Sequence, residues 1–151
     1  MFKQKISLKA RALRFLSMRE HSRIELERKL TPHVQEGEDV NAVLDFLENA
    51  KYLSNERFSE SLVNRRQERF GNQKILAELQ SHGLASSDME QLKQSLADSE
   101  VGRAIEVLHR KYPDEPNNHL EKSKQMKFLQ QRGFSMRAIT AAIRVTREDL
   151  T

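Results

Sequence analysis

The chain has 151 residues, a formal net charge of +4, 37% hydrophobic and 32% charged residues, and only five glycines and three prolines. This polar balance with few turn residues favours a helix-rich protein with short connections. The absence of cysteine excludes disulfides, thiol chemistry and sulfur-ligated metals. No apolar run approaches the length of a membrane span and no signal-peptide core follows the basic N-terminus, so we expect a cytoplasmic protein without a membrane partner.

Three helices are predicted in the first third of the chain. The first runs over residues 8–19 and has an apolar face made of Leu8, Ala12, Phe15 and Leu16. Ser22 and Glu25 have the spacing of a capping box, in which each side chain bonds the other residue's amide, so a second helix starts there and ends at Thr31-Pro32. Asp39 can cap a third helix, whose apolar residues are Val40, Val43, Leu44 and Leu47.

The middle of the chain repeats this plan. Ser54 can cap a helix that we expect to end at Gly71. A second helix starts at Gly71, where Phe70 and Ile75 have the spacing of a hydrophobic staple. Gly83 ends this helix, in the position where a left-handed residue is least costly.

The last part of the chain contains further helices. A capping box at residues 87–90 predicts one helix, and a separate helix is expected to begin near Ser99, with the buried series Val101, Ile105, Leu108 and Tyr112. Residues 129–134 then match residues 79–84 at a shift of 50, glycine included. Ser135 can cap the final helix.

The recurring pattern indicates three structural repeats. Residues 22–30 match residues 71–79 at a shift of 49, which agrees with the shift of 50 found later in the chain. Units of about 50 residues are too small to bury a core well on their own, so neighbouring units must stack. We therefore expect an all-α, elongated and curved array of three tandem three-helix repeats, covering residues 1–53, 54–98 and 99–151.

Charged residues alternate in blocks along the chain. Residues 1–30 hold nine Lys and Arg against three Asp and Glu, whereas residues 36–60 hold two against seven. The central basic residues are Arg65, Arg66, Arg69 and Lys74. Such a group is either a solvated helix face, the ordinary interpretation, or a binding surface for a negatively charged partner.

No catalytic or cofactor-binding constellation is present in the sequence. The histidines lack metal-ligand spacing, and we expect most of them to be solvated or near helix ends: His21, His33, His82, His109 and His119. The glycines form no phosphate-binding loop, and the carboxylates fall at predicted helix starts and in acidic helices. We therefore expect a binding module with no enzymatic activity, metal or cofactor.

Several stretches, in order and spacing, resemble the RecX regulatory proteins of bacteria over nearly the whole chain. In the first unit the resemblance lies in ALRFLSMREHSRIELERKL, residues 12–30. In the second it lies in YLSNERFSESLV and GNQKILAELQSHGL, and in the third in KYP and KSKQMKFLQQRGFS. His21 and Phe70 depart from the tyrosine often found before the turn, but both remain bulky and planar.

The resemblance implies a partner and a role. Family members bind the RecA recombinase nucleoprotein filament and inhibit its ATPase, strand-exchange and co-protease activities, either along the filament groove or at its growing end. They thereby modulate recombination, DNA repair and the SOS response. The family offers no catalytic residues, so the candidate contacts with RecA or DNA come from the charge pattern: Arg65, Arg66, Arg69, Lys74, Lys124, Lys127 and Arg132. We expect a monomer.

Two other classes of function remain open. A basic helical protein could bind single- or double-stranded nucleic acid without a recombinase, although the nine aromatic residues leave few for base stacking. A purely structural helical adaptor is the other alternative. A salt titration of DNA binding without recombinase distinguishes the first from the family prediction, and a recombinase ATPase assay distinguishes the second.

Overall fold

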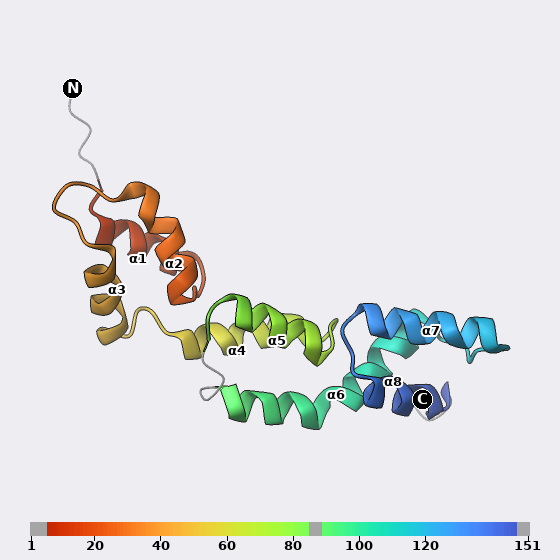
Figure 1. The fold of residues 1–151 in the computed structure, drawn as a ribbon. Coiled ribbons are helices and arrows are strands. Elements are labelled where there is room, and N and C mark those ends of the chain that lie inside the picture. The colour runs from red at the N-terminus through yellow and green to blue at the C-terminus, as the bar shows by residue number, and fades with distance from the viewer. Residues whose placement is uncertain (1–5, 85–88, 148–151) are drawn as a thin grey trace. The chain divides into compact units, whose positions relative to one another are not determined.

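The computed structural model describes residues 6–84 and 89–147, and every regular element in these ranges is helical (Figure 1). The α-helices are α1 (Leu8–Met18), α2 (Arg23–Leu30), α3 (Val40–Asn49), α4 (Asn55–Arg66), α5 (Asn72–Ser81), α6 (Glu90–Lys111), α7 (His119–Gln131) and α8 (Met136–Arg144). A short 3-10 helix, η1 (Thr31–His33), follows α2. The predicted all-α class is confirmed.

The chain divides into two compact units. The first comprises Met1–Ser61 with His82–Leu84, and the second comprises Leu62–Ser81 with Ala85–Thr151. Helix α4 therefore contributes residues to both units. The predicted boundaries of three repeats, at residues 53 and 98, stay a prediction.

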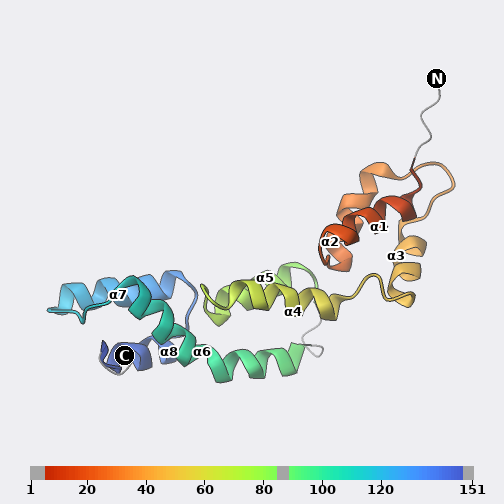
Figure 2. The ribbon, with the colours of Figure 1, turned by 180° about the vertical axis from the view of Figure 1, so that it is seen from behind.

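In the first unit, α1, α2 and α3 pack against one another (Figure 2). Their core residues are Leu8, Ala12, Leu26, Leu30, Leu44, Leu47 and Leu53. The Ser22 hydroxyl accepts a hydrogen bond from the Glu25 amide at 3.1 Å, so that half of the predicted capping box is confirmed. The other half is wrong, because the Glu25 carboxylate binds the Arg19 guanidinium instead.

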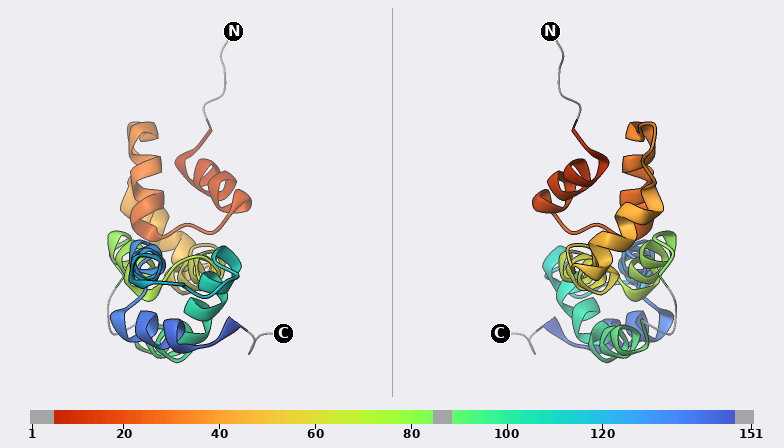
Figure 3. Two further views of the ribbon diagram at one scale, coloured as in Figure 1. Left: turned by 90° about the vertical axis from the view of Figure 1, so that its right-hand side faces the viewer. Right: turned by 90° about the vertical axis from the view of Figure 1, so that its left-hand side faces the viewer.

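In the second unit, α6, α7 and α8 pack against one another (Figure 3). Their buried core consists of Ala104, Val107, Leu108, Leu129, Phe134, Ala138, Ile139 and Ala142. The Ser135 hydroxyl accepts from the Ala138 amide at 3.2 Å, so the predicted cap of α8 is confirmed. The expected series Val101, Ile105, Leu108 and Tyr112 lies against this core, with Leu108 the most buried.

Two predicted helix boundaries are wrong. No new helix begins near Ser99: α6 is continuous from Glu90 to Lys111, and the Ser99 hydroxyl caps no helix start but donates to the Leu96 carbonyl of the preceding turn at 3.3 Å. The capping box predicted at residues 87–90 falls partly outside the described residues. Helix α4 ends at Arg66 rather than Gly71, and in the turn that follows, Arg103 donates to the Gln67 and Phe70 carbonyls at 3.4 and 2.9 Å while the Gly71 amide donates to the Arg132 carbonyl.

Two glycine turns share one packing arrangement. Gly83 (φ +67°) and Gly133 (φ +90°) have the left-handed conformation predicted from their positions after α5 and α7. A Cβ on Gly133 would lie 2.6 Å from Lys74 Cγ, and a Cβ on Gly83 would overlap Ile24 Cδ1. Each turn therefore packs closely on the first turn of a helix about 60 residues earlier, α2 in the first unit and α5 in the second.

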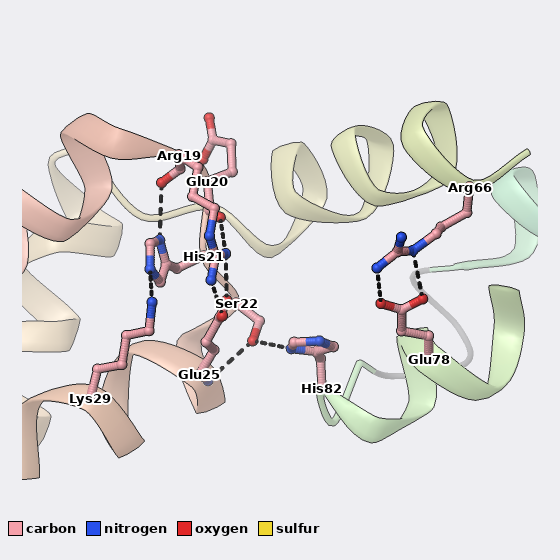
Figure 4. Close-up of polar contacts among 9 residues, drawn as sticks. All are labelled: Arg19, Glu20, His21, Ser22, Glu25, Lys29, Arg66, Glu78 and His82. Carbon is pink, nitrogen blue, oxygen red and sulfur yellow. Dashed lines mark hydrogen bonds and ion pairs between the residues drawn. The ribbon is translucent and has the colours of Figure 1, made fainter.

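Polar contacts reinforce both turns. In the first unit, Ser22 Oγ lies 2.7 Å from His82 Nδ1 (Figure 4). In the second, the Gly71 amide donates to the Arg132 carbonyl at 2.8 Å and the Gln73 amide donates to the Gly133 carbonyl at 3.0 Å. The sequence repeat at a shift of about 50 is thus matched by a repeated contact.

Candidate partner-binding site

All seven predicted contact residues belong to the second unit. Arg65 and Arg66 end α4, Arg69 lies in the following turn, and Lys74 lies in the first turn of α5. Helix α7 carries Lys124 and Lys127, and Arg132 directly follows this helix. The seven cations thus come from three segments of the second unit: α4 with the turn after it, α5, and α7 with the residue after it.

Arg66 is engaged in an ion pair. Its Nε and terminal nitrogen donate to the two oxygens of the Glu78 carboxylate at 3.0 and 3.1 Å (Figure 4). These hydrogen bonds raise the pKa of Arg66 above its ordinary value. The pair joins α4 to α5 and cancels both charges, so Arg66 offers less free charge than the sequence suggested.

Two of the predicted cations lie against the Phe70 ring. Lys74 Nζ lies 5.3 Å from the ring centroid, and the Arg132 guanidinium lies 5.6 Å from it. Arg132 also lies 5.2 Å from the centroid of Phe128 and donates to the Arg69 carbonyl at 3.5 Å. We call Arg69, Phe70, Lys74, Phe128 and Arg132 the Phe70 cluster. Cation–π contacts hold two of its charges in place.

The other predicted cations lie elsewhere. Lys124 borders a separate hollow whose charged lining also includes Lys111, Asp114, Glu115 and Glu121. Lys127 is exposed on α7 and makes no hydrogen bond or ion pair to another described residue. Arg65 is exposed in the last turn of α4. The structure thus separates the Phe70 cluster from the rest of the predicted set.

A buried carboxylate that the sequence did not reveal bonds Asn72, two residues after Phe70. Glu100, 3% exposed, accepts from the Asn72 amide at 3.0 Å, from the Ser135 amide at 3.2 Å and from the Ser135 hydroxyl at 2.6 Å. One carboxylate therefore bonds the start of α5 and the residue before α8. Negative charge at a helix N-terminus is favourable because the unpaired amides point toward it.

Arg103, one turn after Glu100 on α6, was also missed. Its guanidinium donates to the Phe70 carbonyl at 2.9 Å and the Leu96 carbonyl at 3.1 Å, and it binds Asn72 Oδ1. Burial lowers the pKa of Arg103, and the nearby Glu100 charge partly offsets this effect. The available signal was the position of both charges on the inward face of α6, between Leu96 and Val107.

His21 lies near helix ends, as expected for most of the histidines, between α1 and the Ser22 cap of α2, but it is buried rather than solvated. This ring is 1% exposed, its Nδ1 lies 3.0 Å from the Arg19 carbonyl, and its Nε2 lies 2.8 Å from Lys29 Nζ (Figure 4). Burial lowers the pKa of His21 below its ordinary value. A neutral ring fits both contacts, with Nδ1 donating to the carbonyl and Nε2 accepting from the ammonium.

Two absences hold for residues 6–84 and 89–147, the part of the chain that the structure describes. No group of three or more metal-ligating side chains is gathered there. None of the helices in these ranges is long and apolar enough to cross a membrane.

Comparison with known proteins assigns the family. Two family models match, the first three-helix domain of RecX over residues 9–47 and the third three-helix domain of RecX over residues 98–143. A regulatory protein RecX from Herbaspirillum seropedicae is 56% identical over 137 residues, which are 91% of this chain and 89% of that protein. The chain belongs to the RecX family.

Other RecX proteins agree with this assignment. The regulatory protein RecX of Herminiimonas arsenicoxydans is 54% identical over 149 residues, 99% of both chains. A crystal structure of RecX from Lactobacillus salivarius superposes with a TM-score of 0.74 at 21% identity, covering 90% of this chain and 92% of the other. At that identity the superposition shows the shared helical fold, and the family membership is carried by the sequence matches.

Proposed function

We propose that this chain is a non-enzymatic regulator that binds the RecA nucleoprotein filament and inhibits its ATPase, strand-exchange and co-protease activities. We propose further that the chain is a monomer, acts in the cytoplasm and modulates recombination, DNA repair and the SOS response. It is supported by the RecX family membership, because the relatives carry the name regulatory protein RecX.

The observation that carries the proposal is the Phe70 cluster. Lys74 and Arg132 are held against one aromatic ring, and a nucleoprotein filament offers both carboxylates and phosphates to such cations. Arg65, Lys124 and Lys127 remain further candidate contacts with RecA or DNA. Arg66 is proposed as a support of the α4–α5 pair because Glu78 already neutralises it.

The test is ATP hydrolysis by the cognate RecA on single-stranded DNA, measured with and without this protein. We expect the hydrolysis rate to fall as the protein is added. Direct binding to the same DNA without RecA, measured over a salt titration, is the matched control. Strong DNA binding with no effect on RecA would favour the nucleic-acid-binding alternative.

A further inference from the structure

A hollow of about 370 Å³ opens beside the Phe70 cluster. Its lining residues are Arg66, Phe70, Lys74, Ile75, Ala77 and Glu78. The apolar part comes from Phe70, Ile75 and Ala77, which α5 and the preceding turn supply. An open hollow with an apolar lining suits an inserted aliphatic or aromatic side chain.

The charges around this hollow are unbalanced. Arg66 and Glu78 form one wall and neutralise each other through two hydrogen bonds. Lys74 at the rim, and Arg132 across the Phe70 ring, make no ion pair with a described carboxylate. The hollow therefore has an apolar lining and a positive rim, which favours a ligand that combines an apolar group with negative charges.

Both cations at Phe70, Lys74 at the rim of the hollow and Arg132 outside its lining, are partly immobilised before any ligand arrives. The Arg132 guanidinium lies between two aromatic rings and bonds the Arg69 carbonyl. The Lys74 stem packs against Gly133, where even an added methyl group would lie 2.6 Å from Lys74 Cγ. Less side-chain entropy is lost on binding when the side chains are already held in place.

We propose that this hollow seats an apolar side chain from an acidic peptide segment of the partner protein, whose flanking carboxylates pair with Lys74 and Arg132. The inference rests on the proposed function and specifies where the filament protein is held. A single strand of nucleic acid fits less well. It brings a phosphate with every nucleotide and requires a continuous basic groove, whereas this hollow has aliphatic Ile75 and the Glu78 carboxylate in its lining.

Ala77 offers a substitution that tests the hollow without touching the core. Its side chain lines the hollow and is exposed on α5, so Ala77→Glu adds a carboxylate to the hollow while the buried residues of α5 stay unchanged. Ala97→Glu is the matched control, because Ala97 is exposed on α6 in the same unit and does not line this hollow. Lys74→Ala removes one rim charge.

The first measurement is fluorescence anisotropy with a labelled peptide in which one leucine is flanked by glutamates on both sides. We expect it to bind the parent protein, and to bind at least about tenfold more weakly to Ala77→Glu and Lys74→Ala, while Ala97→Glu binds like the parent. Peptides with serine for leucine, or glutamine for glutamate, should also bind more weakly. Equal binding by these two peptides, or by Ala77→Glu, overturns the inference.

Two further measurements identify the kind of partner. If labelled oligothymidine loses affinity for Ala77→Glu while the acidic peptide does not bind the parent, the hollow is a nucleic-acid site and the inference is overturned. In the RecA ATPase assay, Ala77→Glu should inhibit less than Ala97→Glu. Equal inhibition overturns the inference but leaves the proposed function standing, whereas a parent protein that does not inhibit RecA removes the proposed function itself.

Discussion

Arg66 and Glu78 face each other across α4 and α5 with two nearly equal hydrogen bonds, at 3.0 and 3.1 Å. Both side chains are about one-third exposed, so solvent screens the attraction between them. Arg66→Ala should therefore lower the free energy of unfolding by at most about 1 kcal/mol. Urea denaturation measures this difference, and a much larger loss would show that the pair is worth more than an ordinary surface ion pair.

Reversing the charge of the Phe70 cluster should weaken the interaction with RecA. Replacing Arg69 and Lys74 by glutamate puts like charges opposite an acidic or phosphate-bearing partner. The concentration needed for half-inhibition of RecA ATPase should then rise tenfold or more, which corresponds to a loss of about 1.4 kcal/mol in binding free energy. Both residues are exposed, so the helical circular dichroism spectrum should persist. The matched control replaces Arg110 and Lys122 by glutamate, because both are exposed cations of the second unit that lie outside the Phe70 cluster.

The salt dependence of that effect adds a second readout. Exposed charges attract one another more strongly at low ionic strength. The difference between the parent and the Arg69 and Lys74 variant should therefore shrink as salt is added. A variant that inhibits like the parent at both low and physiological salt would mean that the cluster is a solvated face, and the contact would then be sought around Lys124 and Lys127.

Leu79 tests the packing of the second unit. Its side chain is fully buried on α5, so Leu79→Ala should lower the free energy of unfolding by about 2 to 5 kcal/mol through lost burial and a residual cavity. The neighbouring Gln80→Ala is the control, because Gln80 is exposed on the same helix. Equal denaturation midpoints for the two variants would contradict the assigned inward face.

Two glycines should respond in opposite directions to the same substitution. A Cβ on Gly71 would overlap the backbone nitrogen of Phe134, so Gly71→Ala must push the two turns apart and should destabilise the protein. Gly102 lies within α6 with nothing within 4 Å, so Gly102→Ala should stabilise by up to about 1 kcal/mol through helix propensity. Thermal denaturation of both variants tests the close approach directly.

His21 should make the stability of the protein depend on pH. Burial lowers its pKa in the folded state, with the positive charges of Arg19 and Lys29 nearby and Glu25 acting in the opposite direction. The unfolded protein then binds the proton more readily. His21 therefore contributes fully to the free energy of unfolding above about pH 6.5, the ordinary pKa of histidine. This contribution is lost as the pH falls through that value toward the lower pKa of the folded state.

Replacing His21 by glutamine removes this titration. When the pH falls from about 7.5 to about 5.5, the melting temperature of the parent protein should fall further than that of the His21→Gln variant. Burial also lowers the pKa of His109, but that residue is present in both proteins and its contribution cancels in the comparison. Identical pH profiles for the two proteins would show that His21 does not titrate in this way.

Local patterns predicted much of the fold because they depend on neighbouring residues. The helical period, the caps at Ser22 and Ser135, and the left-handed glycines at 83 and 133 are each set within a few positions of the chain, and each is confirmed. The end of α4 could not be predicted in this way, because the turn after it bonds residues far along the chain, Arg103 and Arg132.

The candidate site was predicted less completely than the fold. Sequence spacing identified the cations but could not show that Glu78 neutralises Arg66, nor that Arg132 approaches Phe70 from more than 60 positions away. No role was assigned to Glu100 from the sequence. Only the packing of α6 shows that its carboxylate is buried beneath two helix starts.

That shared carboxylate links the opening motions of two helices. The Glu100 carboxylate accepts hydrogen bonds from the amides of both Asn72, at the start of α5, and Ser135, before α8. When one of these helix starts frays, Glu100 loses one of the bonds that hold its carboxylate in place, so the bond to the other helix start weakens as well. Amide protons at these two sites should then exchange with deuterium at similar rates, as one cooperative unit. Glu100→Ala should speed exchange at both sites together, while the first turn of α2, capped by Ser22, keeps its own rate.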